Sequence, residues 1–247
     1  MSRKQRSSGG SQKRIHAYVA TPAYDGRVLT DFCISLAESC QLATALGINV
    51  TAGVMGNGAF IDLARNHFVQ MFLKTDCTHL FYIDADLRFE ARAFVSLLQC
   101  PWDVSCGVYP RRQTEENYPV HWIPHAEGGL TVTNGWVHCD KVPTGFLCIK
   151  RHVVETMAEK AQKISVENQG ILTQDVPRLF YTFINDEGKF VGEDYAWSLD
   201  YVAQTGKPVY VWPDFDFTHA GYKGNWHNWL NSQIAKEEAE DAVSAAA

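Results

Sequence analysis

Short apolar runs alternate with segments of helical period along the first part of the chain. Three runs of apolar, β-branched or aromatic residues are typical of buried strands: residues 15–20, 48–55 and 79–83. Each is followed by a segment with apolar residues at helical spacing, which predicts helices at residues 30–46, 59–73 and 90–98. On the second helix the pattern turns Phe68 and Phe72 inward and leaves Arg65 and Asn66 on another arc. The alternation of strands and helices predicts a parallel, Rossmann-like sheet with right-handed crossovers.

The second half of the chain continues the sheet with an interruption. Further strands are predicted at residues 104–109, 142–149 and 208–212, and further helices at residues 151–162 and 192–205. Glycine and aromatic residues between Tyr118 and Cys139 indicate a looped antiparallel ribbon, whereas the pattern assigns no element to residues 169–187. We therefore expect an α/β protein with a mostly parallel central sheet, flanking helices and a smaller antiparallel ribbon.

Composition limits the folded part of the chain. Residues 1–14 are basic and polar, with too little apolar surface to offset the entropy of ordering, so we expect a disordered tail. Residues 15–230 are expected to form one domain. Residues 231–247 are rich in Ala and Glu, which predicts a helical or disordered C-terminal tail.

Net charge and cysteine content exclude several kinds of protein. A net charge of −6 gives no broad cationic field, so nucleic acid is not expected as a partner. The seven cysteines are odd in number and include no Cys-x-x-Cys pair, which argues against a disulfide framework and a zinc ribbon. No apolar run is long enough for a transmembrane segment, and no secretory leader is recognisable. We expect a soluble, cytoplasmic protein, with peripheral attachment to a membrane left open.

Two carboxylates directly follow the most apolar strand. Residues Leu80 to Ile83 are apolar or aromatic, and Asp84 and Asp86 come next with one residue between them. Open α/β sheets bind ligands at the carboxyl ends of their strands, and residues two positions apart on extended backbone share one face. Such a pair suits a hard divalent cation. The alternative is structural, with Asp84 capping the next helix and Asp86 in a turn.

Six motifs together resemble those of glycosyltransferases of the A-type fold (GT-A), in particular family-2-like sequences. In chain order they are Thr21-Pro22-Ala23-Tyr24-Asp25-Gly26, Ala64-Arg65-Asn66, Phe81-Tyr82-Ile83-Asp84-Ala85-Asp86, Thr144-Gly145, Gly192-Glu193-Asp194 with Trp197, and His219. Each motif is weak by itself, but six in the family's order on the expected elements are fairly specific. The resemblance spans residues 15–225 and implies a GT-A fold and a nucleotide-sugar donor.

The resemblance also implies a metal site at the Asp-x-Asp motif. In the family the second carboxylate reaches a Mn²⁺ or Mg²⁺ ion that bridges the donor diphosphate, so Asp86 is the first expected ligand. Asp84 is expected to face the ribose or to meet the metal or its water shell. His219 is expected to supply a third ligand, whose imidazole favours Mn²⁺. The alternative for His219 is a loop histidine hydrogen-bonded to backbone.

Glu193 and Asp194 match the pair that contains the general base in inverting members of the family. Inversion needs a carboxylate within hydrogen-bond reach of the acceptor hydroxyl, opposite the leaving diphosphate. Asp194 is the expected base, with Glu193 and Trp197 expected near the acceptor. The alternative is an ordinary helix start, since acidic residues are favoured in a first turn.

The remaining candidate residues are assigned by resemblance to the nucleotide and its phosphates: Thr21, Tyr24, Asp25, Arg65, Gly145 and Arg112. An aromatic ring such as Tyr24 can stack on a base, and Asp25 can bond to ribose hydroxyls or the base. Arg65 is expected to reach the nucleotide or pair with Asp84, or else to be a surface charge. Gly145 would let the backbone approach the donor sugar, and Arg112 would meet phosphates or lie in a solvated turn.

The sequence thus predicts a metal-dependent glycosyltransferase that moves a sugar from a UDP- or GDP-sugar to a hydroxyl of a glycan, a lipid-linked sugar or a protein, with inversion. Alternatives are a retaining glycosyltransferase, a nucleotidyltransferase or a non-catalytic glycan-binding module. A nucleotidyltransferase would carry a glycine-rich, basic loop after the first strand, whereas residues 21–26 contain one Gly and no Lys. Both Asp86 and Asp194 argue against a binding module. No spacing in the chain encodes the donor, the acceptor or the stereochemistry.

Overall fold

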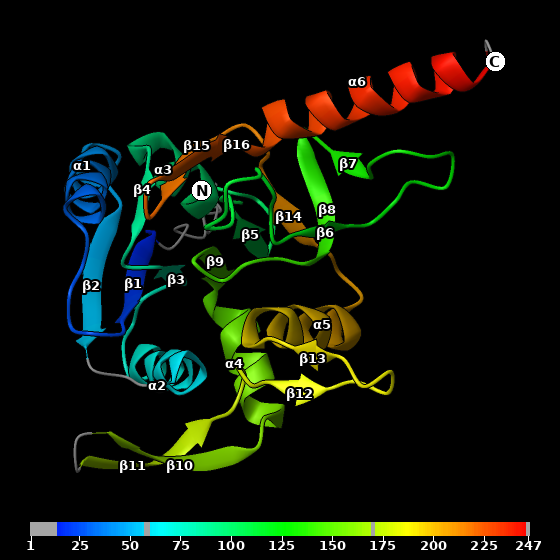
Figure 1. Cartoon of the computed structure of the whole chain (residues 1–247). Coiled ribbons are helices and arrows are strands. Elements are labelled where there is room, and N and C mark those ends of the chain that lie inside the picture. Colours follow the sequence, from blue (N-terminus) through cyan, green and yellow to red (C-terminus); the bar gives the residue numbers. More distant parts are fainter. Residues whose placement is uncertain (1–13, 57–59, 169–170, 246–247) are drawn as a thin grey trace, which may run out of the picture.

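The computed structural model of the chain has a central sheet between two layers of helices (Figure 1). It describes residues 14–56, 60–168 and 171–245, so the predicted N-terminal tail lies outside the described residues except for Arg14. The helices are α1 (Thr30–Ala45), α2 (Ile61–Leu73), α3 (Ala91–Leu98), α4 (Arg151–Lys160), α5 (Glu193–Thr205) and α6 (Trp226–Ala245). Helices α1 and α3 cover one face of the sheet, and α2, α4 and α5 cover the other (Figure 1).

The central sheet has nine strands, of which eight form one continuous order. The order is β2 (Asn49–Gly56), β1 (His16–Ala23), β3 (His79–Ile83), β9 (Phe146–Lys150), β5 (Val104–Cys106), β14 (Val209–Val211), β8 (Trp136–Lys141) and β6 (His121–Trp122), with β7 (Val132–Thr133) also paired to β8. The pairings make all of these strands run in one direction except β9 and β8. The predicted fold class, α/β with a mostly parallel sheet and a small antiparallel ribbon, is confirmed.

Strand β3 explains how the sheet builds two cores at once. All five of its residues are buried, as expected for a strand covered on both faces. Because side chains alternate along a strand, Leu80 and Tyr82 join the core under α2, α4 and α5, whereas Phe81 and Ile83 join the core under α1 and α3. Burial on both faces fixes β3 in the middle of the sheet, so the start of the turn at residues 84–86, which follows it directly, is held in place.

A small antiparallel sheet lies beyond the carboxyl end of β3. It consists of β4 (Leu87–Phe89), β15 (Asp216–His219) and β16 (Tyr222–Asn225), with β15 in the centre. The chain therefore passes from the central sheet to the small sheet within residues 84–86. This short crossing brings the late strand β15 beside the Asp-x-Asp motif.

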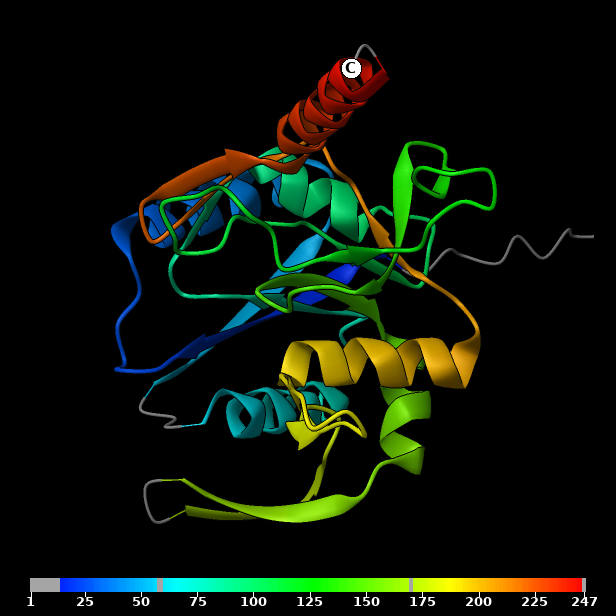
Figure 2. The same ribbon diagram turned by 45° about the vertical axis from the view of Figure 1, so that its right-hand side comes forward.

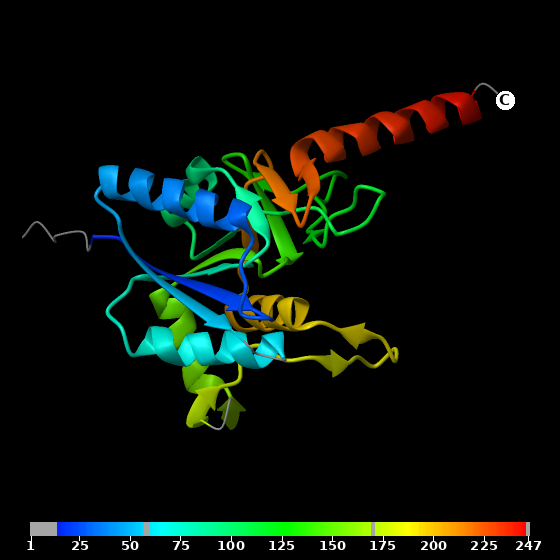
Figure 3. The ribbon, with the colours of Figure 1, turned by 60° about the vertical axis from the view of Figure 1, so that its left-hand side comes forward.

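Two hairpins and the last helix extend from this body. The hairpins are β10 (Lys163–Asn168) with β11 (Ile171–Pro177), and β12 (Phe183–Ile184) with β13 (Phe190–Val191), and they fill much of the range to which the pattern assigned no element (Figure 3). Helix α6 projects away from the sheet (Figure 2). No helix in the described ranges combines the length and the apolar character that a membrane crossing needs.

Helix α2 differs from its predicted face. Arg65 is 3% exposed and Asn66 is fully buried, although the pattern placed both on an outer arc, whereas Ile61 is exposed. The apolar residues Phe68 and Phe72 do face the core as predicted. The difference comes from tertiary contacts. Both polar side chains make hydrogen bonds to residues outside α2, and the spacing of apolar residues along a helix does not predict such bonds. Five of the seven cysteines are buried and all are free, as expected.

Candidate active site

The Asp84–Asp86 turn is held by backbone hydrogen bonds on both sides. The amide of Asp84 donates to the carbonyl of Gly145 (2.9 Å), and the amide of Ala220 donates to the carbonyl of Asp86 (3.0 Å). In the pairing of β4 with β15, His219 lies opposite Leu87, the residue that follows Asp86. The register of a three-residue strand therefore brings His219 to Asp86, far apart in the sequence.

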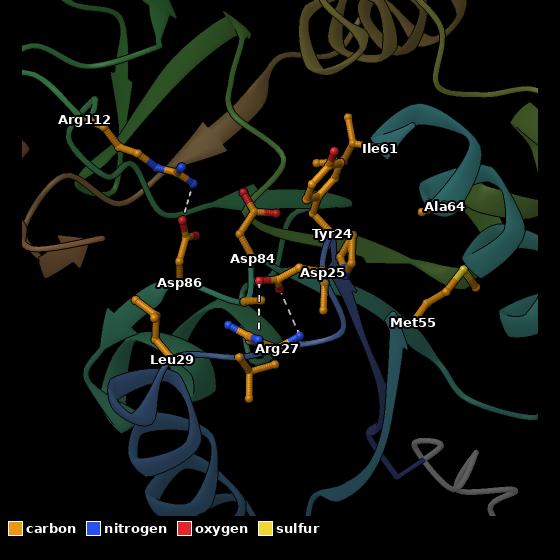
Figure 4. Close-up of a pocket in the computed structure, with 14 residues that line it drawn as sticks. Tyr24, Asp25, Arg27, Leu29, Met55, Ile61, Ala64, Asp84, Asp86 and Arg112 are labelled. Carbon is orange, nitrogen blue, oxygen red and sulfur yellow. Dashed lines mark hydrogen bonds and ion pairs between the residues drawn. The ribbon is translucent and has the colours of Figure 1, made fainter. Parts of the chain in front are cut away.

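Asp86, Arg112 and His219 form one cluster. Nε2 of His219 lies 3.6 Å from Oδ2 of Asp86, and Arg112 donates from Nε to the same Nε2 (2.9 Å) and from its terminal nitrogen to Asp86 (Figure 4 draws the second contact). Nδ1 of His219 lies 2.8 Å from the carbonyl oxygen of Pro110, which can only accept a hydrogen bond. The proton is therefore on Nδ1, and the lone pair on Nε2 accepts the hydrogen bond from Arg112.

Asp84 belongs to a second, more buried cluster. Arg65 of α2 lies 3.3 Å from Asp84 through Nη2 and bonds through Nη1 to Glu193, the first residue of α5. The hydroxyl of Tyr109 donates to the other oxygen of Asp84 (3.3 Å). Burial alone lowers the pKa of Arg65, but the nearby carboxylates of Asp84 and Glu193 outweigh it, and the pKa is raised. Arg65 thus pairs with Asp84, one of its expected roles, and also ties β3 to α5.

Gly145 lies against this cluster with no room for a side chain. Its amide donates to the hydroxyl of Tyr109 (3.0 Å), and a Cβ at this position would overlap both that hydroxyl and the carboxylate of Asp84. The close approach that glycine permits here is to Asp84 and Tyr109. Contact of Gly145 with a donor sugar stays a prediction.

Substitution of Gly145 by alanine is expected to destabilise the fold by about 1–3 kcal/mol, because the added methyl group must push Asp84 and Tyr109 aside. Urea denaturation of the variant measures this loss. The same substitution in a Tyr109→Phe background removes the overlap with the Tyr109 hydroxyl and is expected to cost less. Equal costs in both backgrounds would argue that the overlap with Tyr109 is relieved in some other way.

One cavity, of about 680 Å³, lies along the loop after β1 and the Asp84–Asp86 turn (Figure 4). Tyr24 and Asp25 line it, and Tyr24 is 77% exposed. Asp25 accepts a hydrogen bond from the amide of Arg27 (3.1 Å) and holds its own loop in this way. Thr21, which was expected to contact the nucleotide, is fully buried in β1 and does not line the cavity. Its expected role is therefore corrected to that of a residue of the sheet.

A second cavity, of about 380 Å³, lies on the other side of the Asp86 cluster. Asp194 and His219 line it, and Arg112 lines both cavities. Burial, and next the neighbouring Glu193, raise the pKa of Asp194 to about 6, while Arg65 and the amide of Tyr195 oppose the rise. A carboxylate with this pKa is ionised at neutral pH and basic enough to accept a proton.

Trp197 does not reach either cavity, which corrects its expected place near an acceptor. Its side chain is 1% exposed and is stacked between Phe180 (ring centroids 5.9 Å apart) and Tyr201 (5.6 Å) in the core under α5. An indole without exposed surface cannot stack on a sugar. Trp197 instead anchors the helix that carries Asp194.

Two residues with clear roles were given no role from the sequence, although Asn66 was part of one motif. Tyr109 bonds Asp84 and Gly145, as described above. Asn66 donates to the carbonyl of Phe180 (2.6 Å) and accepts from the amides of Leu179 (2.7 Å) and Phe180 (2.8 Å). The available signal was its spacing of three residues from both Leu63 and Val69 on α2, but its backbone partners are more than a hundred residues away.

A group of three side chains with metal-ligating atoms lies at the opposite end of the sheet. The ligand atoms of His16, Asp76 and Cys77 are all within 4.8 Å of one another. Within the described ranges, the atoms of Asp84, Asp86 and His219 do not form a group of this spacing. The side chains near the Asp-x-Asp turn instead supply a closely spaced pair, Asp86 and His219.

The chain has limited similarity to known proteins. No protein-family model and no curated protein sequence matches it. Among solved structures, it is similar to A197 from STIV, with 17% identity and a TM-score of 0.46 over 83% of this chain and 85% of that one. It is also similar to the inositol-1-phosphate CTP transferase from T. maritima, with 12% identity and a TM-score of 0.42 over 83% and 89% of the two chains.

Proposed function

We propose that this protein is a metal-dependent glycosyltransferase that transfers a sugar from a nucleoside-diphosphate sugar to a hydroxyl group, with inversion. The observation that carries the proposal is the arrangement of two cavities around one polar cluster. Asp86 lines the first cavity, Asp194 lines the second, and Arg112 lines both. A donor on one side and an acceptor on the other would meet beside Asp86 and His219.

The first cavity suits a nucleotide. Its volume lies within the roughly 300–1,000 Å³ that is usual for ligand pockets. The exposed ring of Tyr24 is available for stacking on a base, and Asp25 for bonds to ribose hydroxyls. Asp84 and Asp86 lie at the end of the same cavity. A diphosphate would therefore be placed beside the carboxylates at the end of β3.

Asp86 and His219 are the residues that would hold Mn²⁺ or Mg²⁺. The pair offers one carboxylate oxygen and one imidazole nitrogen with its lone pair free of protons, a set that favours Mn²⁺. Asp84, which is bonded to Arg65 and Tyr109, would act through the water shell of the ion or on the ribose. When bound, such an ion neutralises the charge that develops on the leaving diphosphate.

Asp194 is the proposed general base. As the acceptor oxygen bonds to the anomeric carbon, its proton passes to Asp194, and the bond from that carbon to the diphosphate breaks with its electron pair on the diphosphate. Glu193 was expected to contact the acceptor, but Arg65 bonds its carboxylate, so we assign it a positioning role at the start of α5. Arg112 lines both cavities, which supports its proposed role of meeting the phosphates.

The pH dependence of kcat/KM follows from the pKa of Asp194. Only the ionised carboxylate accepts a proton, so the rate is expected to rise with pH through about 6 and to level off above it. Initial rates at fixed Mn²⁺ between pH 5 and 8 measure this limb. A profile that stays flat through this range would contradict the assignment of Asp194.

Turnover decides between the proposal and its alternatives. The purified chain is incubated with Mn²⁺ and a panel of nucleotide sugars and acceptors, and release of nucleoside diphosphate is measured. Asp86→Ala and His219→Ala are expected to abolish release, whereas Glu159→Ala, an exposed acid on α4, is expected to leave it unchanged. Pyrophosphate release from a nucleoside triphosphate and a sugar phosphate would indicate a nucleotidyltransferase instead. A product with retained anomeric configuration would remove Asp194 as base, and glycan binding without any turnover would leave a binding module.

A further inference from the structure

We infer that Arg112 is an internal counter-ion that blocks the metal-ligand pair until a diphosphate draws it away, so that metal and nucleoside diphosphate bind cooperatively. The inference rests on the proposed function, because Asp86 and His219 are metal ligands only in that proposal. It adds a control on whether metal or nucleotide binds first, through a residue that was expected either to meet phosphates or to lie in a solvated turn.

The contacts of Arg112 leave no place for a second cation. Its guanidinium bonds both ligand groups at once, Nε2 of His219 at 2.9 Å and the carboxylate of Asp86. These two groups lie only 3.6 Å apart. Because Nδ1 of His219 is committed to the carbonyl of Pro110, the ring has one lone pair, which cannot bind Arg112 and a metal ion together. Binding of an ion by this pair therefore requires Arg112 to leave.

Arg112 also lines the cavity in which the diphosphate is proposed to bind. Its side chain is 56% exposed, so more than half of its surface is open to solvent. It lines the first cavity as well as the second, and a guanidinium matches the geometry of phosphate oxygens with two parallel hydrogen bonds. The other arginine that lines the first cavity, Arg27, lies near Asp25. A diphosphate that enters this cavity offers Arg112 an anionic partner to replace Asp86.

Linkage makes the two binding events support each other. Without nucleotide, an ion must displace Arg112 into water, whereas with nucleotide Arg112 exchanges one anion for another. The diphosphate therefore raises the affinity for the ion, and the ion raises the affinity for the diphosphate by the same factor. Direct contact between ion and diphosphate adds coupling of its own, so the part that depends on Arg112 has to be isolated by substitution.

The test is the affinity for MnCl₂ alone, measured by calorimetry and by the electron paramagnetic resonance of free Mn²⁺. Arg112→Ala is expected to bind Mn²⁺ about tenfold more tightly than the wild type, since one charge-assisted competitor is lost. Arg112→Lys keeps the positive charge but not the paired N–H donors of the guanidinium. Its affinity for Mn²⁺ should lie between those of the wild type and Arg112→Ala. Arg111→Ala removes the same charge at the neighbouring residue, and its affinity for Mn²⁺ should stay close to that of the wild type. With saturating UDP or GDP, wild type and Arg112→Ala should differ much less.

This experiment distinguishes a failure of the counter-ion role of Arg112 from a failure of the proposed metal site. Unchanged or weaker binding of Mn²⁺ alone by Arg112→Ala overturns the counter-ion role, and so does an equal gain in Arg111→Ala. The ligand assignment is tested by Asp86→Ala and His219→Ala, each made in both the wild-type and the Arg112→Ala background. If neither weakens Mn²⁺ binding in either background, the metal site of the proposed function fails, and the counter-ion role fails with it. If they weaken binding and Arg112→Ala does not tighten it, the proposed metal site stands without the counter-ion.

Discussion

Replacing Arg65 with methionine is expected to lower the free energy of unfolding by about 3–5 kcal/mol, because the change leaves two carboxylates without their buried cation. Arg65 is 3% exposed, and the side chains of its partners Asp84 and Glu193 are 18% and 17% exposed. Methionine keeps most of the apolar stem of arginine, so the loss reports the charges rather than the packing. Urea denaturation followed by circular dichroism gives the value if the slope with denaturant is unchanged.

Two further variants make this result specific. Arg88→Met removes an exposed arginine that pairs with Asp31 and is expected to cost at most about 1 kcal/mol. In the triple variant Arg65→Met, Asp84→Asn and Glu193→Gln, none of the three substituted positions carries a charge, so part of the stability should return. A loss below about 1 kcal/mol in Arg65→Met, equal to that in Arg88→Met, would contradict the buried ion-pair assignment.

Substitution of Asp194 by asparagine is expected to lower kcat by about 10²–10⁴, the usual contribution of a general base. Binding of UDP or GDP should stay the same, because Asp194 lines the second cavity and not the first. Calorimetry of nucleotide binding together with initial rates separates the two effects. Glu187→Gln, at an exposed site in the β12–β13 hairpin, serves as a control and should keep full activity. Full activity in Asp194→Asn would exclude its role as base.

The same substitution is expected to stabilise the fold. The pKa of Asp194 is raised from 3.8 to about 6 in the folded chain, so folding takes up a proton between these values and stability falls as the pH rises through this window. Above pH 6 the full cost of the buried carboxylate remains. Asparagine avoids this cost, and the gain at pH 7 should be up to about 3 kcal/mol in urea denaturation, with little gain at pH 4. Lower stability of the variant at pH 7 would contradict this sign.

The sequence was sufficient for the features that depend on neighbouring residues. The apolar run of β3 and the acids directly behind it predicted both the buried strand and the place of the candidate site, because a strand end is a local feature. His219 was named by resemblance, and its proximity to Asp86 depends on the register of β4 and β15, which no pattern in either strand specifies. The order of elements along the chain likewise did not predict that β9 lies between β3 and β5 and runs antiparallel to both.

Two helical residues have surroundings that the helical period did not predict. Arg65 pairs with Asp84 as expected, but it is buried and also bonds Glu193, which lies 128 positions further along the chain. Trp197 follows Asp194 by one helical turn, which suggested a shared site, yet its ring stacks with Phe180 and Tyr201 in the core. In both cases the decisive partner comes from tertiary packing, which local spacing does not contain.

The bridge from Asp84 through Arg65 to Glu193 has a consequence for the stereochemistry of the proposed transfer. It fastens the end of β3 to the first turn of α5, so in that reaction the fold itself would set the separation between the leaving diphosphate and Asp194. A fixed separation favours a single line of attack on the anomeric carbon and saves the entropy of aligning base and donor during the reaction. Arg112 is more exposed than Arg65, at 56% against 3%, and is the residue that we propose to move when a diphosphate binds.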